Sequence, residues 1–444
     1  MGATSSTGPT SPSQPSFVRS AMTADRSPPV PTSGPLAWLR DNLFPGPMSA
    51  VATILGLLFL LWVIPPLARF LFLDAIWSAD NGDACRAPEA GACWAYVRQK
   101  FGFFMYGSYP REDVWRVNLT LVAGAVLTLW MLWPDARGRG GAALAFFTVY
   151  PVLAFGILTG SPPFPIGWLP SSPEGQIAWM VLIVALFATA STLFYLNRYT
   201  GWAIAIFGFI AWSELGSWWS SLELPLVGTH LWGGIFVSLL VATVGIVFSL
   251  PLGIALALGR RSQMPVLRFL SVMLIEFVRG VPLITVLVMA NTMLPLFVPD
   301  SWSPDRLLRP LIGVALFSAV YMAEVVRGGL QSVPKGQYEG AMSLGLSWWQ
   351  MTRLVVLPQA LVTVIPGIVN SFIALFKDTT LVAIVGIFDF LKAVDTGRLD
   401  PVWAGPKIST TGYVFAAIFY FIFCFGMSRY SMMMERRHSA GRSR

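Results

Sequence analysis

The chain has 444 residues, of which 55% are apolar and only 12% are charged, and its mean hydropathy is +0.64. Soluble globular domains carry about 25% charged residues, so this composition excludes a soluble protein and indicates an all-α integral membrane protein. The formal net charge of +8 does not indicate a nucleic-acid partner, because the basic residues are scattered beside apolar segments and do not gather in one patch.

The N-terminal segment 1–47 is predicted to be disordered and cytoplasmic. Positions 1–36 are rich in Ser, Pro, Thr and Gly and show no apolar period, so they cannot bury enough surface to offset the entropy of ordering. The segment has neither the n-region nor the cleavage site of a signal peptide, so we expect the first apolar stretch to remain in the protein as a span.

A membrane-spanning helix needs about 20 mostly apolar residues, and about ten segments meet this requirement. Basic residues follow the second, fourth, sixth and last of them, whereas the segments 160–176 and 219–230 contain neither Lys nor Arg. The positive-inside rule therefore places both termini and the basic tail 431–444 in the cytoplasm, and the large loop 74–116 outside. The predicted spans are 48–72, 117–133, 141–159, 177–196, 201–218, 231–258, 269–297, 308–326, 362–388 and 411–430.

Two of the three cysteines, Cys85 and Cys93, lie in the outer loop, and Cys424 lies in the last span. An oxidising space outside the membrane permits a disulfide between the two loop cysteines, and two free thiols remain the alternative. The only histidines, His230 and His438, are far from both cysteines, so we expect no metal site.

A short polar helix and a glycine turn are predicted after the eighth span. Ser332 can cap the helix, and residues 335–344 give it a length of roughly 15 Å. Gly345 then ends it, since glycine enters the left-handed conformation without a steric penalty. Ser347 and Gln350 restart a helix with the S-x-x-Q spacing of a capping box.

Residues 339–358, EGAMSLGLSWWQMTRLVVLP, resemble the EAA loop of binding-protein-dependent ABC importer permeases. That pattern is Glu-Ala-Ala, three residues, Gly, nine residues and an Ile-x-Leu-Pro ending. The resemblance implies that the loop 328–358 contains a coupling helix that docks on a separate ATPase subunit. A helical hairpin with a simple glycine cap is the alternative, but the complete spacing favours the coupling loop. The coupling residues are Glu339, Gly340 as a departure at the second place, Ala341, Gly345, Leu357 and Pro358, with Val355 in the Ile position.

The region 229–430 resembles the core of the polar amino acid permease family, notably at 229–262, 275–284, 321–347 and 357–387. The additional spans in 48–225 and the segment CRAPEAGACW resemble the M-type permease subunit of the general L-amino acid transporter. The resemblance implies a type I ABC importer permease core in a bacterial inner membrane. It also implies five partners: a homologous permease subunit, ATP-binding cassette ATPase subunits, a periplasmic amino-acid-binding protein, membrane lipid and an L-amino acid substrate.

Ionisable side chains inside spans cost about 2.5–3.5 kcal/mol each on insertion scales, so they are functional candidates. An amino acid zwitterion needs a partner of opposite charge at each end, and the seventh and ninth spans each carry both signs. Pro282 is expected to kink the seventh span and open a backbone carbonyl. The alternative is that the opposite charges only neutralise one another, which we favour for Glu324 and Arg327. The expected substrate-path residues are Glu276, Arg279, Asn370, Lys377, Asp378 and Thr379.

The sequence carries no enzyme motif of the common kinds. No lysine follows a glycine, so the chain has no P-loop, and it has neither a Gly-x-Ser-x-Gly elbow nor an H-E-x-x-H helix. We therefore expect no cofactor in this chain and an energy source in a separate ATP-binding subunit. A secondary amino acid transporter or channel, and a membrane receptor or scaffold, remain the rival functions.

Overall fold

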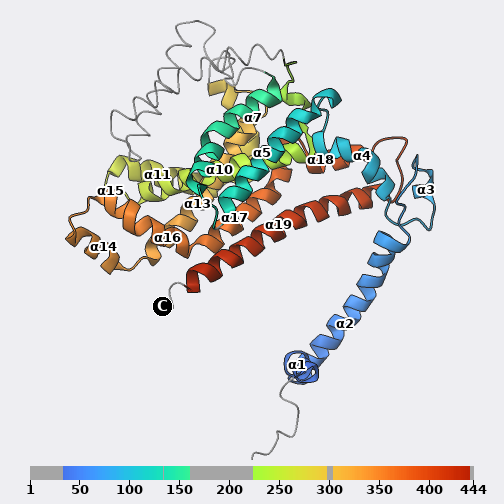
Figure 1. The fold of residues 1–444 in the computed structure, drawn as a ribbon, viewed down its shortest axis with the longest axis horizontal. Helices are drawn as coiled ribbons and strands as arrows, with labels where there is room; N and C mark the ends of the chain where they lie inside the picture. Colours follow the sequence, from blue (N-terminus) through green and yellow to red (C-terminus); the bar gives the residue numbers. More distant parts are fainter. Residues whose placement is uncertain (1–33, 134, 161–223, 298–303, 441–444) are drawn as a thin grey trace, which may run out of the picture. The chain divides into compact units, whose positions relative to one another are not determined.

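The computed structural model describes residues 34–133, 135–160, 224–297 and 304–440 (Figure 1). Its chain divides into two compact units, Met1–Phe70 and Leu71–Arg444.

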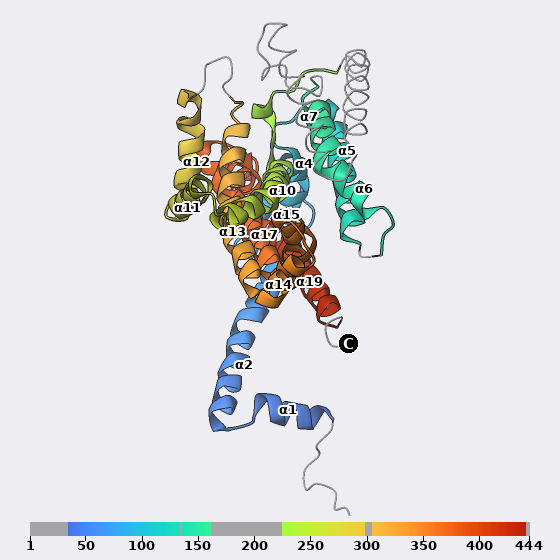
Figure 2. The same ribbon diagram turned by 90° about the vertical axis from the view of Figure 1, so that its left-hand side faces the viewer.

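The first unit consists of two helices joined at a corner (Figure 2). Helices α1 (Pro35–Leu43) and α2 (Pro47–Ala68) each begin with proline, which is favoured where the first N–H has no helical partner. The Thr53 hydroxyl donates to the Leu43 carbonyl at 2.6 Å and closes the corner. Positions 35–43 thus form a helix within the segment 1–47 that was predicted to be disordered, because apolar residues such as Trp38 follow the Ser- and Pro-rich stretch.

The second unit is a helical bundle with α10 (Gly234–Arg260) at its centre, packed most extensively against α13 (Leu308–Ser332). Small residues allow the two backbones to approach closely. A Cβ atom at Gly253 would lie 2.8 Å from the Met322 side chain and 3.0 Å from the Ala319 carbonyl oxygen. The other helices of the described bundle are α5 (Val114–Leu132), α6 (Arg139–Leu144), α7 (Tyr150–Thr159), α11 (Pro265–Arg279), α12 (Leu283–Thr292), α17 (Ile365–Asp378), α18 (Phe390–Gly397) and α19 (Ile408–Ala440).

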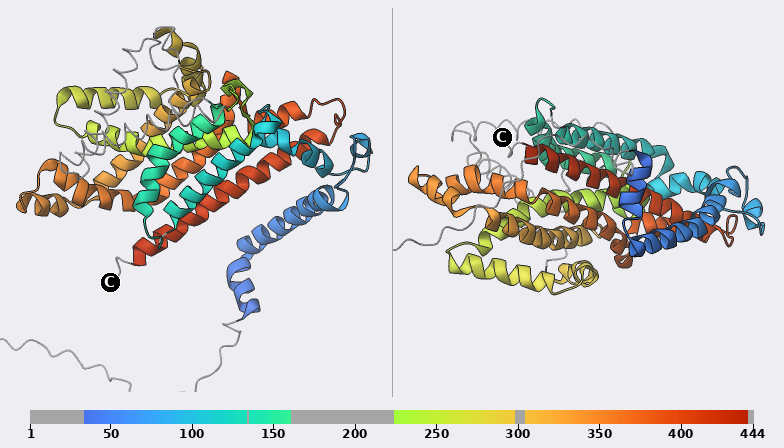
Figure 3. Two further views of the ribbon diagram at one scale, coloured as in Figure 1. Left: turned by 45° about the horizontal axis from the view of Figure 1, so that its top comes forward. Right: turned by 90° about the horizontal axis from the view of Figure 1, so that it is seen from below.

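Helix α19 runs along α17 (Figure 3). The Phe376 ring of α17 packs on three aromatic rings of α19, with centroids 6.0 Å from Phe419, 5.4 Å from Tyr420 and 5.3 Å from Phe423. These contacts join the last span to the centre of the bundle. The remaining short elements are η1 (Arg69–Leu73), η2 (Arg111–Asp113), η3 (Ala145–Val149), η5 (Thr229–Leu231), η6 (Leu294–Phe297), η9 (Thr379–Val385) and β1 (Phe388–Asp389).

Among the described residues, six helices are long and apolar enough to cross a membrane, and the count rises to seven if a bent helix pair forms one span. The predicted spans 177–196 and 201–218 lie outside the described residues. The predicted all-α membrane class is confirmed for the part of the chain that the structure describes. The six spans are Pro47–Leu73, Arg111–Leu132, Gly234–Arg260, Leu308–Ser332, Ile365–Val385 and Ile408–Arg437.

The predicted seventh span, 269–297, is broken into α11 and α12, whose axes differ by 108° (Figure 2). Pro282 has no N–H to continue α11 and becomes the N-cap of α12. The Gly280 N–H donates to the Glu276 carbonyl at 3.0 Å and completes the last turn of α11. The expected kink is therefore a complete break in the helix.

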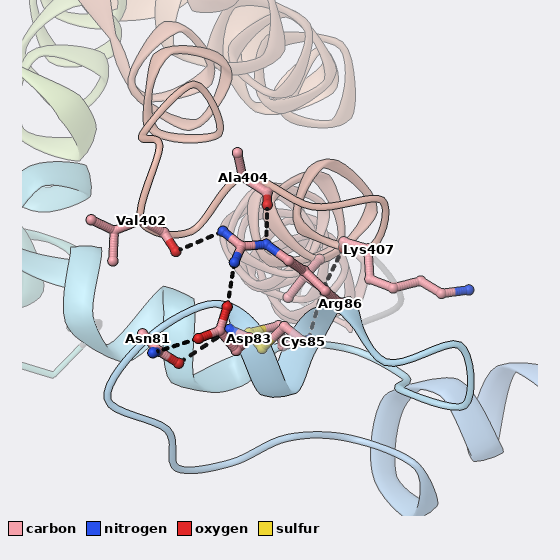
Figure 4. The surroundings of a disulfide bond; sticks show 9 residues. Asn81, Asp83, Cys85, Arg86, Val402, Ala404 and Lys407 are labelled. Atoms are coloured by element: carbon pink, nitrogen blue, oxygen red, sulfur yellow. Dashed lines mark hydrogen bonds and ion pairs between the residues drawn. A yellow bond between two sulfur atoms is a disulfide. The ribbon is translucent and has the colours of Figure 1, made fainter.

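The loop 74–116, which was predicted to lie outside, is folded rather than irregular, with α3 (Asp83–Arg86) and α4 (Trp94–Tyr106). A disulfide joins the buried Cys85 and Cys93, which settles the alternative left open by the sequence (Figure 4). Arg86 donates from Nε to the Ala404 carbonyl at 2.9 Å and from a terminal nitrogen to the Val402 carbonyl at 3.1 Å. These hydrogen bonds attach the disulfide-bonded segment to the connection between α18 and α19.

Candidate coupling loop and translocation cavity

The predicted helix, turn and helix are all present after α13. Helix α14 (Lys335–Ser343) ends at Gly345, whose φ of 73° is left-handed. The Gly345 N–H donates to the Met342 carbonyl at 2.9 Å, and the Leu346 N–H donates to the Ala341 carbonyl at 3.3 Å. These two bonds form the Schellman motif that closes a helix C-terminus.

The second helix starts with the predicted capping box. The Ser347 hydroxyl accepts from the Gln350 N–H at 3.3 Å, and the Gln350 side chain accepts from the Ser347 N–H at 3.0 Å. The predicted cap by Ser332 is wrong, because this hydroxyl donates to the Gly329 carbonyl within α13, and Pro334 is the N-cap of α14. The loop continues through α15 (Trp348–Met351), η8 (Thr352–Val356) and α16 (Leu357–Thr363).

The motif residues of α14 divide between two faces. Glu339 is exposed, whereas Ala341 is only 3% exposed and lies in a buried cluster with Leu330, Met351 and Val356. The expectation that Ala341 itself docks on a partner is therefore revised: Ala341 anchors α14 to the bundle. A Cβ atom at Gly340 would meet no atom within 4 Å, so this departure from the motif leaves the packing unchanged.

Large apolar side chains lie exposed around the glycine turn, which is unusual for a surface that contacts only water. Leu344 is 80% exposed, and the remaining members are Met342, Trp348 and Trp349. Leu357 and Pro358, the last motif residues, begin α16. Gln359 of α16 donates to the Gln337 side chain of α14 at 2.9 Å, so the two ends of the loop are joined.

Five charged side chains from three helices meet at the end of the bundle that carries α14. A terminal nitrogen of Arg260 lies 2.9 Å from carboxylate oxygens of both Glu276 and Glu324. Glu324 also lies 2.8 Å from Arg327 and 3.7 Å from Arg279. We refer to these five residues as the ionic network; it joins α10, α11 and α13.

The alternative of mutual neutralisation holds for Glu324, which pairs with Arg327 three positions later on the same helix, but not for Glu276 with Arg279. Glu276 of α11 pairs with Arg260 of α10, and Arg279 of α11 lies near the Glu324 carboxylate of α13. In the sequence, Arg260 is one of two basic residues that follow the sixth predicted span. The predicted span that ends just before Arg260 contains neither Asp nor Glu, which indicates that Arg260 pairs with a carboxylate of another helix.

A cavity of about 290 Å³ lies between α10, α13 and α17. Asp378 is the one carboxylate in its lining, and three serine hydroxyls, from Ser249, Ser318 and Ser371, also contribute. The serines were missed because a single hydroxyl in an apolar helix gives no distinctive pattern. The remaining lining residues are Phe317, Tyr321, Met322, Phe372, Ala374 and Leu375.

The other expected substrate-path residues are not brought to this cavity. Lys377 and Asn370 are exposed elsewhere on α17, and Glu276 and Arg279 belong to the ionic network. Thr379 is buried, and its hydroxyl donates to the Phe376 carbonyl at 2.8 Å. Among the expected substrate-path residues, Asp378 alone therefore lines this cavity.

A multi-span helical bundle with an exposed EAA loop defines a permease, the membrane subunit of a transporter that is driven by a separate ATPase. The sequence profile of the binding-protein-dependent transport system inner membrane component matches residues 249–439. The chain belongs to the inner-membrane permeases of amino-acid ABC transporters.

Two relatives cover almost the whole chain. The inner membrane amino-acid ABC transporter permease protein YhdY of Escherichia coli is 44% identical over 413 residues, covering 93% of this chain and 95% of the relative. The glutamate/glutamine/aspartate/asparagine transport system permease protein BztC of Rhodobacter capsulatus is 42% identical over 438 residues, covering 95% and 98%. Among solved structures, an amino acid ABC transporter with histidines matches 46% of this chain and 92% of its own, with 26% identity and a TM-score of 0.40.

Proposed function

We propose that this permease carries L-amino acids across the inner membrane, with the loop 328–358 docked on an ATPase subunit and Asp378 on the substrate path. The observation that carries the proposal is the division of α14 into an exposed Glu339 and a buried Ala341. A docking surface needs an accessible face, and coupling needs a rigid connection to the spans.

The exposed apolar side chains around Gly345 support docking on a protein partner. Met342, Leu344 and Trp348 surround the turn and are left open to solvent in this single chain. Because ATP is available in the cytoplasm, the end of the bundle with α14 is assigned to the cytoplasmic side, together with both termini. The proposed assembly contains a homologous permease, two ATPase subunits and a periplasmic amino-acid-binding protein.

The cavity at Asp378 supports passage of a zwitterion. A desolvated ammonium group needs an anion, which the Asp378 carboxylate supplies, and a substrate carboxylate can accept from the Ser318 hydroxyl. The Ser249 and Ser371 hydroxyls donate to carbonyls of their own helices. The proposed role needs neither metal nor cofactor in this chain, and the described residues contain no cluster of metal-ligating side chains.

The cavity assignment is tested by comparing two neighbouring substitutions in the reconstituted transporter. Asp378→Asn keeps the shape but removes the charge, and we expect uptake to fall at least tenfold, because truncated buried charge pairs cost about 2–5 kcal/mol. Lys377→Met is the matched control, since Lys377 is exposed and outside the cavity lining. Equal uptake by the Asp378→Asn variant and the wild type would remove Asp378 from the path.

A further inference from the structure

The two consecutive arginines at the end of α10 reach different parts of the coupling machinery. Arg261 is the C-cap of α10, and one of its terminal nitrogens lies 3.2 Å from the Tyr338 hydroxyl of α14. The same nitrogen donates to the Leu330 carbonyl of α13 at 3.2 Å, and the Tyr338 hydroxyl donates to that carbonyl at 3.0 Å. The guanidinium also lies 5.8 Å from the centre of the Tyr338 ring, within cation–π range.

Arg260, the preceding residue, points into the ionic network. It lies between Glu276 of α11 and Glu324 of α13, at 2.9 Å from each. Charge-assisted hydrogen bonds of this length are about twice as strong as neutral ones. Removing Arg260 from its place would leave two carboxylates close together in a partly buried site, with fewer cations to balance them.

We propose that Arg261 is a positioning residue for the coupling helix and that the Arg260–Arg261 pair transmits displacement of α14 to the ionic network. Arg260 and Arg261 share one peptide unit, so a displacement of the backbone at Arg261 also displaces the backbone that carries Arg260. The Arg261 N–H also donates to the Leu258 carbonyl at 3.1 Å, which fixes the pair to the last turn of α10. This inference rests on the proposed function, in which α14 is moved by an ATPase.

The arrangement is suited to a reversible link. Arg261 is exposed and Tyr338 is half-buried, so their contact can break without leaving a charge stranded in the membrane. The Glu324 side chain is 17% exposed, so rearrangement there changes the balance between α10, α11 and α13. A small movement of α14 can thereby alter how three spans are held together.

The test uses the complete transporter in proteoliposomes, with uptake and ATP hydrolysis measured together. Arg261→Met keeps the apolar stem and removes the guanidinium, and Tyr338→Phe removes a single oxygen atom. Arg261→Lys keeps a cation and a donor. The matched control is Arg268→Met, an exposed arginine of α11 for which the described part of the chain shows no side-chain partner.

We expect Arg261→Met and Tyr338→Phe each to raise the ATP hydrolysed per amino acid imported by roughly fivefold or more, the scale of a typical coupling free energy. The double variant should be no worse than the single ones, and Arg261→Lys should recover part of the coupling. Arg268→Met should keep the wild-type ratio. An unchanged ratio in both single variants, or a loss confined to complex yield or Tm, would overturn the proposal. Lack of ATP-dependent uptake in the wild type would instead reject the proposed function.

Discussion

Gly340 and Gly345 lie five positions apart in the coupling loop and face different constraints. Gly340 is in the middle of α14, where alanine is more favourable than glycine by about 1 kcal/mol. Gly345 has a left-handed backbone, which costs a residue with a Cβ about 1–2 kcal/mol. No atom lies within 4 Å of a Cβ placed at either position, so only the backbone conformation separates them.

We therefore expect Gly345→Ala to destabilise the turn by about 1 kcal/mol and to weaken ATP-driven uptake, whereas Gly340→Ala should stabilise α14 and keep uptake. The free energy of opening can be followed by hydrogen exchange of the α14 amides, alongside transport. Equal behaviour of the two variants would show that the left-handed turn does not matter for coupling.

The site residues that the sequence could predict are those defined by local rules. The Gly345 turn and the Ser347 and Gln350 capping box depend on neighbours within a few positions, so both appear in the structure as expected. The partner of Glu276 could not be predicted, because Arg260 lies on another helix and is brought close only by packing. The choice between pairing within a helix and pairing across helices requires knowledge of the helix rotations.

At the scale of elements, helix α18 depends on a buried carboxylate. Asp389 is fully buried, and its two oxygens accept from the Leu391 N–H at 3.1 Å and the Lys392 N–H at 3.0 Å. Burial raises the pKa of Asp389 to about 6, because it disfavours the charged form more than the backbone donors favour it. Ser238 of α10 accepts from the next N–H, that of Phe390, at 2.9 Å, so this cap also joins α18 to the central helix.

The raised pKa of Asp389 predicts that the free energy of unfolding depends on pH. An unfolded aspartate titrates near pH 3.9, so between about pH 4 and pH 6 the folded state holds more protons and its stability falls as the pH rises, by up to roughly 3 kcal/mol. Asp389→Asn keeps an acceptor oxygen but does not titrate. The free energy of unfolding of this variant should therefore not fall between pH 4 and pH 6, and at pH 7 it should exceed that of the wild type. Thermal unfolding in detergent from pH 4 to pH 7 measures the difference; parallel curves for the two proteins would contradict the assignment.

The sequence predicted the positions of some helices but not the break between α11 and α12. Apolar length located α10, α13 and α19, because a span needs a minimum number of apolar residues. The same criterion merged α11 and α12, since apolar residues continue through the break and only Pro282 marks it. A proline predicts a distortion, but the 108° angle depends on what each half packs against.

At the scale of the whole molecule, the loop, the ionic network and the cavity lie on one set of helices. Helix α13 contacts the coupling loop through Leu330, the network through Glu324 and the cavity through Ser318. All three residues belong to one continuous helix. Under the proposed function, this helix connects the loop that docks on an ATPase subunit to the cavity at Asp378.

The most direct test of coupling is amino acid uptake by proteoliposomes that contain the permease pair, with and without the ATPase subunits. With the amino-acid-binding protein outside and ATP available to the ATPase, we expect uptake only in the complete vesicles. Glu339→Lys should insert normally but lose uptake, because the reversed charge opposes docking. Uptake at the same rate in vesicles that lack the ATPase, driven by an ion gradient, would contradict the account and identify a secondary transporter.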